Sequence, residues 1–253
     1  MSTNRRIYLD FNATSPLHPA ARAALLDAMA AVGNPSSIHE EGRRTRARIS
    51  RARAQVAALL ARPTDQIVFT SGGTEANVLG VRALAALAEQ EGRPRVIATT
   101  PLEHPSLRGV VASLGWRVTG LDDPEASVAA FAAVNHELGT LEPRAFDPGL
   151  RARGVRVHVD AVQAAGKLDL ATIHADAIAI SGHKLGAPQG IGALALGEDR
   201  GLPLVEAGHQ ERGRRPGTEN TLGIVGFGAA AAAVDLSRWP AVAALGAVLE
   251  RGL

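Results

Sequence analysis

Three short segments of the sequence place side chains that can do chemistry among glycines and apolar residues. One of them, SGHKLGAPQG at residues 181–190, holds Lys184 beside His183 and between Gly182 and Gly186, next to a strongly apolar run. A lysine shielded from water has a lowered pKa, and its neutral amine can condense with a carbonyl group. Taken alone, a single lysine is better explained by a surface side chain that extends to water. The other two segments therefore decide the interpretation.

The segment FTSGGTEAN at residues 69–77 indicates a strand that turns through two glycines into a helix. Free amide groups at a helix start attract an anion, and glycine allows a ligand to approach the backbone closely. Thr74 adds a hydroxyl donor beside Gly73. The pattern predicts a phosphate-binding turn, and a tight turn with a threonine near the helix N-cap is the alternative. It matches neither GxxxxGK[ST] nor GxGxxG.

The segment VHVDAVQAAG at residues 157–166 predicts a strand that ends at Asp160, with Gln163 three residues later. A carboxylate in that place can pair with a ring nitrogen of a cofactor and keep it protonated. A carboxylate that caps a following helix is the alternative. Considered together, an amine, a carboxylate and an anion-binding turn are the groups that pyridoxal phosphate requires of a protein.

Alternating helix and strand patterns predict how these segments come together. Apolar periods predict helices over 22–32, 46–61 and 104–115, a turn and long helix over 71–92, and a last helix from Ala241 to Leu253 that continues to the end of the sequence without a capping glycine. Short apolar runs predict strands over 66–70, 95–100, 116–121, 129–135, 155–161, 177–181 and 191–196. This alternation predicts an α/β fold with a buried, mostly parallel sheet. Ligands bind at the carboxyl ends of such strands, where all three segments fall.

Composition narrows the function classes. The 253 residues carry a net charge of +2 and 46% hydrophobic residues, which is typical of a soluble globular protein and gives no indication of nucleic-acid binding. No apolar run is long enough for a membrane span and no signal peptide is recognisable, so a cytoplasmic protein is expected. The sequence contains no cysteine, which excludes cysteine-ligated zinc and a cysteine nucleophile from this chain; no metal site is predicted.

The sequence resembles the fold-type I pyridoxal-phosphate enzymes of aminotransferase class V, and among them the cysteine desulfurases of the nitrogen-fixation type. The segments that carry the resemblance are IYLDFNATSPLHP (7–19), GNPSSIHEEGRRTR (33–46), IVFTSGGTEAN (67–77), EHPSL (103–107), HVDAVQAAGK (158–167), SGHKLGAPQGIGAL (181–194) and GHQERGRRPGTEN (208–220). The resemblance implies a three-layer α/β/α large domain over residues 1–253, in which 1–20 form an N-terminal segment. The family's small C-terminal domain is expected to be missing.

The resemblance also implies a role for each matching residue. Lys184 would form a Schiff base with the cofactor aldehyde and move the substrate Cα proton, and His104 would stack on the ring, so these two are the expected catalytic residues. Asp160 would pair with the ring nitrogen, Gln163 with the ring hydroxyl, and Asn34 would line the substrate side. The phosphate would be held by Gly73, Thr74, Ser181 and His183, and by Thr218 of a neighbouring subunit in a homodimer. The basic run 211–217 is then an active-site loop.

Three departures from the family pattern leave the reaction open. The nucleophilic cysteine and the substrate-clamping arginine of the family have no counterpart here, the stretch from Trp116 to Asn135 is shorter, and His136 stands where the family has an asparagine near the ring hydroxyl. One hypothesis is a compact desulfurase for cysteine or a related amino acid, active in sulfur metabolism and iron–sulfur cluster assembly, with the thiol supplied by a sulfur-acceptor protein or a separate chain. A second is another pyridoxal-phosphate lyase or aminotransferase, such as a selenocysteine lyase. A third is a degenerate dimerising partner of an intact desulfurase.

Overall fold

A computed structural model describes residues 6–197 and 208–252 of the chain, and it contains one mixed sheet. In the described residues the sheet has seven strands in the order β1-β7-β6-β5-β4-β2-β3. Their bounds are β1 Ile67–Thr70, β2 Val96–Ala98, β3 Arg117–Thr119, β4 Val128–Ala132, β5 Arg156–Asp160, β6 Ala177–Ser181 and β7 Gly192–Leu196. β7 runs antiparallel to β1 and β6, and the remaining neighbouring pairs are parallel.

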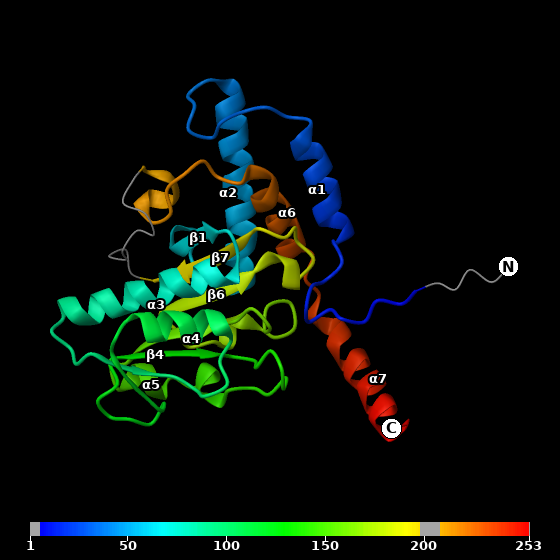
Figure 1. Cartoon of the computed structure of the whole chain (residues 1–253). Helices are drawn as coiled ribbons and strands as arrows, with labels where there is room; N and C mark the ends of the chain where they lie inside the picture. Colours follow the sequence, from blue (N-terminus) through cyan, green and yellow to red (C-terminus); the bar gives the residue numbers. More distant parts are fainter. Residues whose placement is uncertain (1–5, 198–207, 253) are drawn as a thin grey trace.

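Helices cover both faces of this sheet, which gives the three layers that the sequence predicts (Figure 1). Successive residues of a strand point to opposite faces, and β6 shows the division. Ile178 and Ile180 lie in the core that includes residues of α2 and α6, whereas Ala177 and Ala179 lie in the core that includes residues of α3 and α4. The predicted α/β/α fold with a mostly parallel sheet is confirmed.

Five of the helices agree with the predicted ones in place but not always in extent, whereas α5 and α6 were not predicted. Their bounds are α1 Pro19–Met29, α2 Glu40–Leu60, α3 Gly73–Gln90, α4 Pro105–Ser113, α5 Gly149–Ala152, α6 Thr221–Ala232 and α7 Trp239–Gly252. α1 and α2 begin earlier than the apolar periods indicate, because His18 and His39 cap them through their side chains. A cap adds a first turn whose side chains face water, and such a turn carries no apolar signal.

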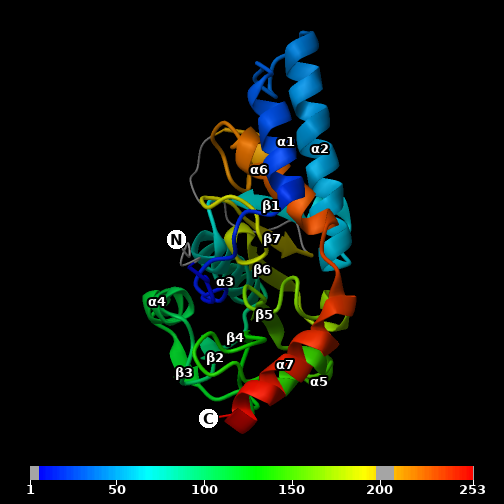
Figure 2. The same cartoon turned by 90° about the vertical axis from the view of Figure 1, so that its right-hand side faces the viewer.

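Helix α6 was not predicted at all. Its sequence TLGIVGFGAAAA is apolar or small on every side, so it has no amphipathic period to recognise. The helix lacks a polar face because it packs against both α1 and α2 (Figures 1 and 2). Its glycines allow these helices to approach it closely. A Cβ atom at Gly228 would lie 2.5 Å from the Cα atom of Ala52 on α2.

Helix α7 extends away from the sheet layers (Figure 1), and none of its residues is buried. Its apolar side chains Val242, Leu245, Val248 and Leu249 are all exposed. In the described ranges no single helix is long and apolar enough to cross a membrane; α6 taken with 236–252, bent by 54° between the two parts, meets the length and composition test only as a pair.

Candidate active site

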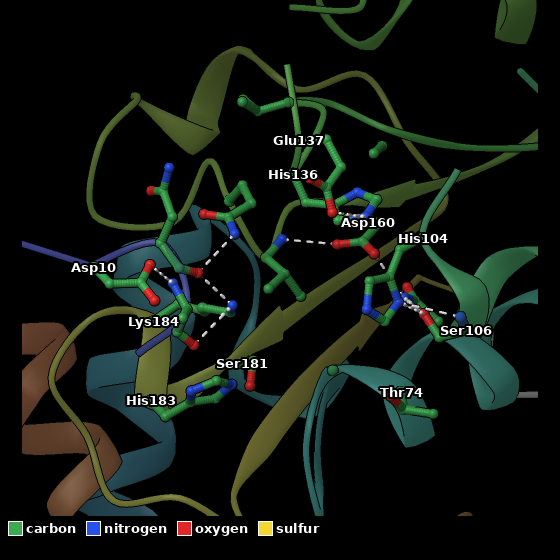
Figure 3. A pocket seen from close by; sticks show the side chains of 18 residues that line it. Asp10, Thr74, His104, Ser106, His136, Glu137, Asp160, Ser181, His183 and Lys184 are labelled. Carbon is green, nitrogen blue, oxygen red and sulfur yellow. Dashed lines mark hydrogen bonds and ion pairs between the residues drawn. The ribbon is translucent and has the colours of Figure 1, made fainter. Parts of the chain in front are cut away.

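A cavity of about 450 Å³ lies where β5 and β6 end and α3 begins. Nine of the residues predicted for the site line it, and Figure 3 shows most of them. They are Gly73, Thr74, His104, His136, Asp160, Gln163, Ser181, His183 and Lys184. They meet because parallel strands deliver their carboxyl ends to the same edge of a sheet. The volume is within the usual range of ligand pockets, about 300–1,000 Å³.

One end of this cavity has the chemistry of an anion site. Helix α3 begins at Gly73, so the first amide groups of the helix have no partner within it and carry partial positive charge. Thr74, Ser181 and His183 line the same cavity, and in Figure 3 Ser181 and His183 lie together. Burial, and then the nearby charge of Lys184, lower the pKa of His183. A neutral histidine, two hydroxyl groups and a helix start can all donate hydrogen bonds to a phosphate.

Gly73 is required by packing as well as by ligand approach. A Cβ atom there would lie 2.7 Å from Cγ2 of Val162 and 3.3 Å from Cβ of Ser181. At the adjacent Gly72 a Cβ atom would meet no atom within 4 Å. Two neighbouring glycines therefore differ in whether a side chain fits.

The substitution Gly73→Ser is expected to lower the free energy of unfolding by about 1–3 kcal/mol, the usual cost of overpacking. It is also expected to weaken binding of pyridoxal phosphate, because Ser181 must move. Gly72→Ser is the matched control, with an expected change of stability below about 0.5 kcal/mol. Thermal unfolding and cofactor titration of both variants check this. Equal losses in the two variants would contradict the assigned packing.

At the opposite side of the cavity lies a buried carboxylate. Asp160 is 6% exposed; its Oδ1 accepts from the amide of Val162 at 2.9 Å and its Oδ2 from Nδ2 of Asn77 at 2.7 Å. Burial raises the pKa of Asp160, and these two hydrogen bonds oppose that effect. The alternative that Asp160 caps a following helix is wrong, because a turn and not a helix follows it.

His104 has two functions in the structure. It caps α4, because its Nδ1 accepts from the amide of Ser106 at 3.1 Å, and its ring lines the cavity. Since Nδ1 accepts this hydrogen bond, the neutral ring carries its proton on Nε2. Burial lowers the pKa of His104, which favours the neutral ring. His136 lies beside it, with the ring centroids 5.1 Å apart and the planes at 76°.

Lys184 is half-buried, and its Nζ donates to the backbone carbonyl groups of Asn12 at 2.5 Å and Ala13 at 3.0 Å. Burial lowers its pKa, while the charges of Asp10 and Asp160 act in the other direction. A lowered pKa agrees with the neutral amine that the sequence predicts at Lys184. Figure 3 shows Lys184 and Asp10 on the same side of the cavity.

The N-terminal segment closes this side of the cavity, and sequence reasoning assigned no role to it. Asp10, Asn12 and Ala13 line the cavity. Nε2 of Gln163 donates to the carbonyl of Asn12 at 3.1 Å, and Nζ of Lys167 donates to Oε1 of Gln163 at 2.8 Å. Only the resemblance over 7–19 could have drawn attention to this segment, because its contacts cross more than 150 positions of the chain.

Asn34 and Thr218 are the two predicted residues that do not line this cavity. Asn34 is exposed and accepts from the amide of Ser36 at 2.9 Å. Thr218 is exposed and lines a separate cavity of about 230 Å³, together with Glu211 and Arg215. Their predicted roles, at the substrate side and toward a neighbouring subunit, remain proposals.

Three polar residues behind the site were also missed. Asn77 lies one helical turn after Thr74 on α3, Ser106 lies two residues after His104, and His158 lies two residues before Asp160 on β5. Asn77 and Ser106 line the cavity, whereas His158 is fully buried behind Asn77. The spacing i, i+3 on a helix puts Asn77 on the same face as Thr74, and i, i+2 on a strand puts His158 on the same face as Asp160, so a signal was available for these two. Ser106 follows the N-cap His104 at the start of α4 and had no such signal.

His158 makes stability depend on pH. Burial lowers its pKa from 6.5 to about 3. Between these values the unfolded chain binds about one more proton than the folded chain, so the free energy of unfolding falls as the pH falls, by about 1.4 kcal/mol per pH unit. Above pH 6.5 the group has no effect.

We expect His158→Gln to remove this pH dependence, because glutamine does not titrate. In urea unfolding below about pH 6.5 and down to about pH 5, the stability of the wild type should fall relative to that of the variant by about 1.4 kcal/mol per unit. The buried acids Asp160 and Glu103 are common to both proteins, so their contributions cancel in the difference. Parallel profiles would show that His158 titrates normally.

Comparison with known proteins agrees with the fold. The family described as aminotransferase class-V matches residues 7–122 and 116–245. A cysteine desulfurase of Trichormus azollae is 44% identical over 249 residues, covering 89% of this chain. A cysteine desulfurase of Bradyrhizobium diazoefficiens is 38% identical over 277 residues, covering 99% of this chain and 70% of the relative. The chain belongs to the aminotransferase class-V family.

Among solved structures, one described as a NifS-like protein superposes with a TM-score of 0.84 at 30% identity, over 92% of this chain and 71% of that chain. Another, described as SspA in complex with cysteine, has a TM-score of 0.82 at 29% identity and covers 90% of this chain and 73% of that one. The chain spans 62% of the length of the Trichormus azollae relative. The resemblance to cysteine desulfurases within this family is confirmed.

Proposed function

We propose that the chain is a pyridoxal-phosphate-dependent enzyme of the cysteine desulfurase type, which forms a Schiff base through Lys184 and acts on cysteine or a related amino acid. The observation that carries the proposal is that one cavity is lined by the amine of Lys184, the buried carboxylate of Asp160 and the start of α3. The relatives named cysteine desulfurase support the choice of substrate.

The residues around the cavity fit this cofactor. Gly73, Thr74, Ser181 and His183 would hold the phosphate through hydrogen bonds and the partial charge of the helix start. Asp160 offers a buried carboxylate held by two neutral donors, so its negative charge is available to a protonated ring nitrogen. Gln163 and His136 would lie at the ring hydroxyl and His104 at the ring face.

When bound, pyridoxal phosphate supplies an electron sink for the electrons released at the substrate α-carbon. The protein supplies orientation and proton transfer. Lys184 acts as nucleophile and as base at Cα, because burial favours its neutral amine. Asp160 would keep the ring nitrogen protonated, and the neutral ring of His104, with its proton on Nε2, would lie at the ring face.

The sulfur acceptor has to come from outside these 253 residues, because they contain no cysteine. An external thiol would take the sulfur from cysteine and become a persulfide, leaving alanine. A second thiol would then release hydrogen sulfide and form a disulfide, so that the two thiols supply the two electrons. An acceptor protein or a separate chain bearing the thiol is part of the proposal.

A homodimer is also part of the proposal. Thr218 is exposed and lies outside its own chain's cavity, as expected of a residue that serves the phosphate of a second copy. Sedimentation of the purified protein with and without the cofactor tests this association.

The test of the function uses the fact that the chain has only two lysines, Lys167 and Lys184. Purified protein is mixed with pyridoxal phosphate, reduced with borohydride and digested, and the modified peptide is identified by mass spectrometry. Modification of Lys184 is expected. The same protein is then incubated with cysteine and a dithiol, and sulfide and alanine are measured. Equal amounts of the two products are expected.

Two results would overturn the proposal. A protein that binds no pyridoxal phosphate lacks the site altogether. A protein that binds it through Lys184 but yields a keto acid or ammonia from a panel of amino acids, and no alanine from cysteine, is a different enzyme of the same family.

A further inference from the structure

Behind Asp160 lies a buried chain of hydrogen bonds that the proposed chemistry does not use. Asn77, which is 1% exposed, donates from Nδ2 to Oδ2 of Asp160 at 2.7 Å and to Oγ of Ser106 at 3.0 Å. An amide nitrogen has two hydrogens, and both are used by these acceptors. The orientation of the Asn77 amide therefore determines how the carboxylate of Asp160 is held.

The amide of Asn77 is in turn held by His158. Nε2 of His158 lies 2.9 Å from Oδ1 of Asn77. The amide oxygen can only accept, so Nε2 must carry the proton of the imidazole. If the amide were rotated by half a turn, its oxygen would face the carboxylate of Asp160, and its NH2 group would face Nε2 of His158. Nε2 would then lose its acceptor. The hydrogen bond from His158 removes that alternative.

If His158 served only to fill space in the core, an apolar side chain would be more favourable at this position. Its side chain is fully buried, and Nδ1 has no hydrogen-bond partner among the described residues. A buried nitrogen without a partner costs free energy that an apolar side chain of similar size would avoid. The ring fits only because position 80 is glycine, since a Cβ atom there would lie 2.5 Å from Nδ1. A buried polar group of this kind calls for an explanation.

We propose that His158 is a positioning residue: its Nε2 proton fixes the amide of Asn77, and this amide fixes the carboxylate of Asp160 toward the cavity. His158, Asn77 and Asp160 meet because His158 and Asp160 lie two residues apart on the same face of β5, below α3. Since every donor in the chain is neutral, the negative charge of Asp160 remains available to a ligand. The inference rests on the proposed function only where it concerns the ring nitrogen of the cofactor.

The experiment compares His158→Leu with His158→Gln. Leucine fills the space but cannot donate, whereas the amide nitrogen of glutamine can take the place of Nε2. We expect His158→Leu to weaken the binding of pyridoxal phosphate about tenfold or more, and to shift the pH at which the cofactor absorbance changes. His158→Gln should restore both toward the wild type. Val159→Ala, a fully buried change on the opposite face of β5, is the control for a general loss of stability.

Two further measurements decide the outcome. The effect of His158→Leu should vanish in an Asp160→Asn background, because the proposed role acts through that carboxylate. Nitrogen NMR of the wild type without cofactor should place the proton of His158 on Nε2, and this needs no variant to fold. A proton on Nδ1, or equal effects of His158→Leu and Val159→Ala, would overturn the inference. Failure of the wild type to bind the cofactor would instead refute the proposed function, and the NMR result would still test the positioning role.

Discussion

Replacement of Lys184 by alanine is expected to abolish the borohydride-reducible bond to pyridoxal phosphate and to lower turnover by a factor of about 10²–10⁴ or more. The amine is the group of this chain that can both bond to the aldehyde and move the Cα proton from inside the cavity. The residues of α3, β5 and β6 that are proposed to hold the phosphate and the ring are unchanged in the variant. Cofactor titration should therefore show weaker, non-covalent binding, and the sulfide assay should show the loss of rate.

Two variants control this result. Lys184→Arg keeps the positive charge but cannot form the bond, so it should lose the reducible band as alanine does. Lys167→Ala removes the other lysine, which donates to Gln163 and Asn12, and should keep the band. Retention of the reducible bond in Lys184→Ala would show that the assigned lysine is wrong.

The largest expected loss of stability comes from Arg53→Ala. Arg53 on α2 donates from Nη1 and Nη2 to the two carboxylate oxygens of Glu211, at 2.6 and 2.7 Å, and the side chain of Glu211 is 2% exposed. Without Arg53 the carboxylate still accepts from the amide of Phe69 at 2.9 Å, a neutral donor that does not balance its charge. Removing one partner of a buried ion pair costs about 3–5 kcal/mol. The unfolding temperature should fall by about 2–4 °C for each kcal/mol of stability that is lost.

The same helix provides the control. Arg48 pairs with Asp27 at 3.0 Å, but the side chain of Asp27 is 75% exposed. An exposed pair contributes about 0–1 kcal/mol, so Arg48→Ala should change the unfolding temperature little. The double change Arg53→Met with Glu211→Leu should recover part of the stability, because no unpaired charge is left buried, although the amide of Phe69 loses its acceptor. If Arg53→Ala lowers stability no more than Arg48→Ala does, the ion pair of Arg53 and Glu211 does not hold the segment 208–220 against α2.

Glu211 also illustrates what sequence patterns cannot show. It lies in the segment 208–220 with a left-handed backbone, φ 47°, and the next residue, Arg212, has φ 58°. Such angles are unfavourable for side chains other than glycine and asparagine. The buried contact with Arg53, which is 158 positions away in the chain, holds this conformation. No local pattern predicts either the angle or the partner. Composition shows the run 211–217 as a basic stretch, and the family resemblance adds only that it is an active-site loop.

The order of helices and strands and the place of the cavity follow from sequence alone. Gly73, Asp160 and Lys184 each come at the end of a strand, and strand ends of a parallel sheet converge whatever the details of packing. The fold and five of the residues that line the cavity, Gly73, Thr74, Asp160, Gln163 and Lys184, could be predicted for this reason. The resemblance to the family added His104, His136, Ser181 and His183. Helix α6 could not, because a helix surrounded by other helices has no polar face to give it a period.

Only the tertiary structure decides which groups stand behind and opposite these strand ends. The contacts of His158 with Asn77, of Lys184 with the carbonyl groups of Asn12 and Ala13, and of Arg53 with Glu211 each join distant parts of the chain. They depend on the register between α3 and β5 and on where the N-terminal segment lies. Periodicity reports which face of an element is buried, and it carries no information on which residue lies across that face.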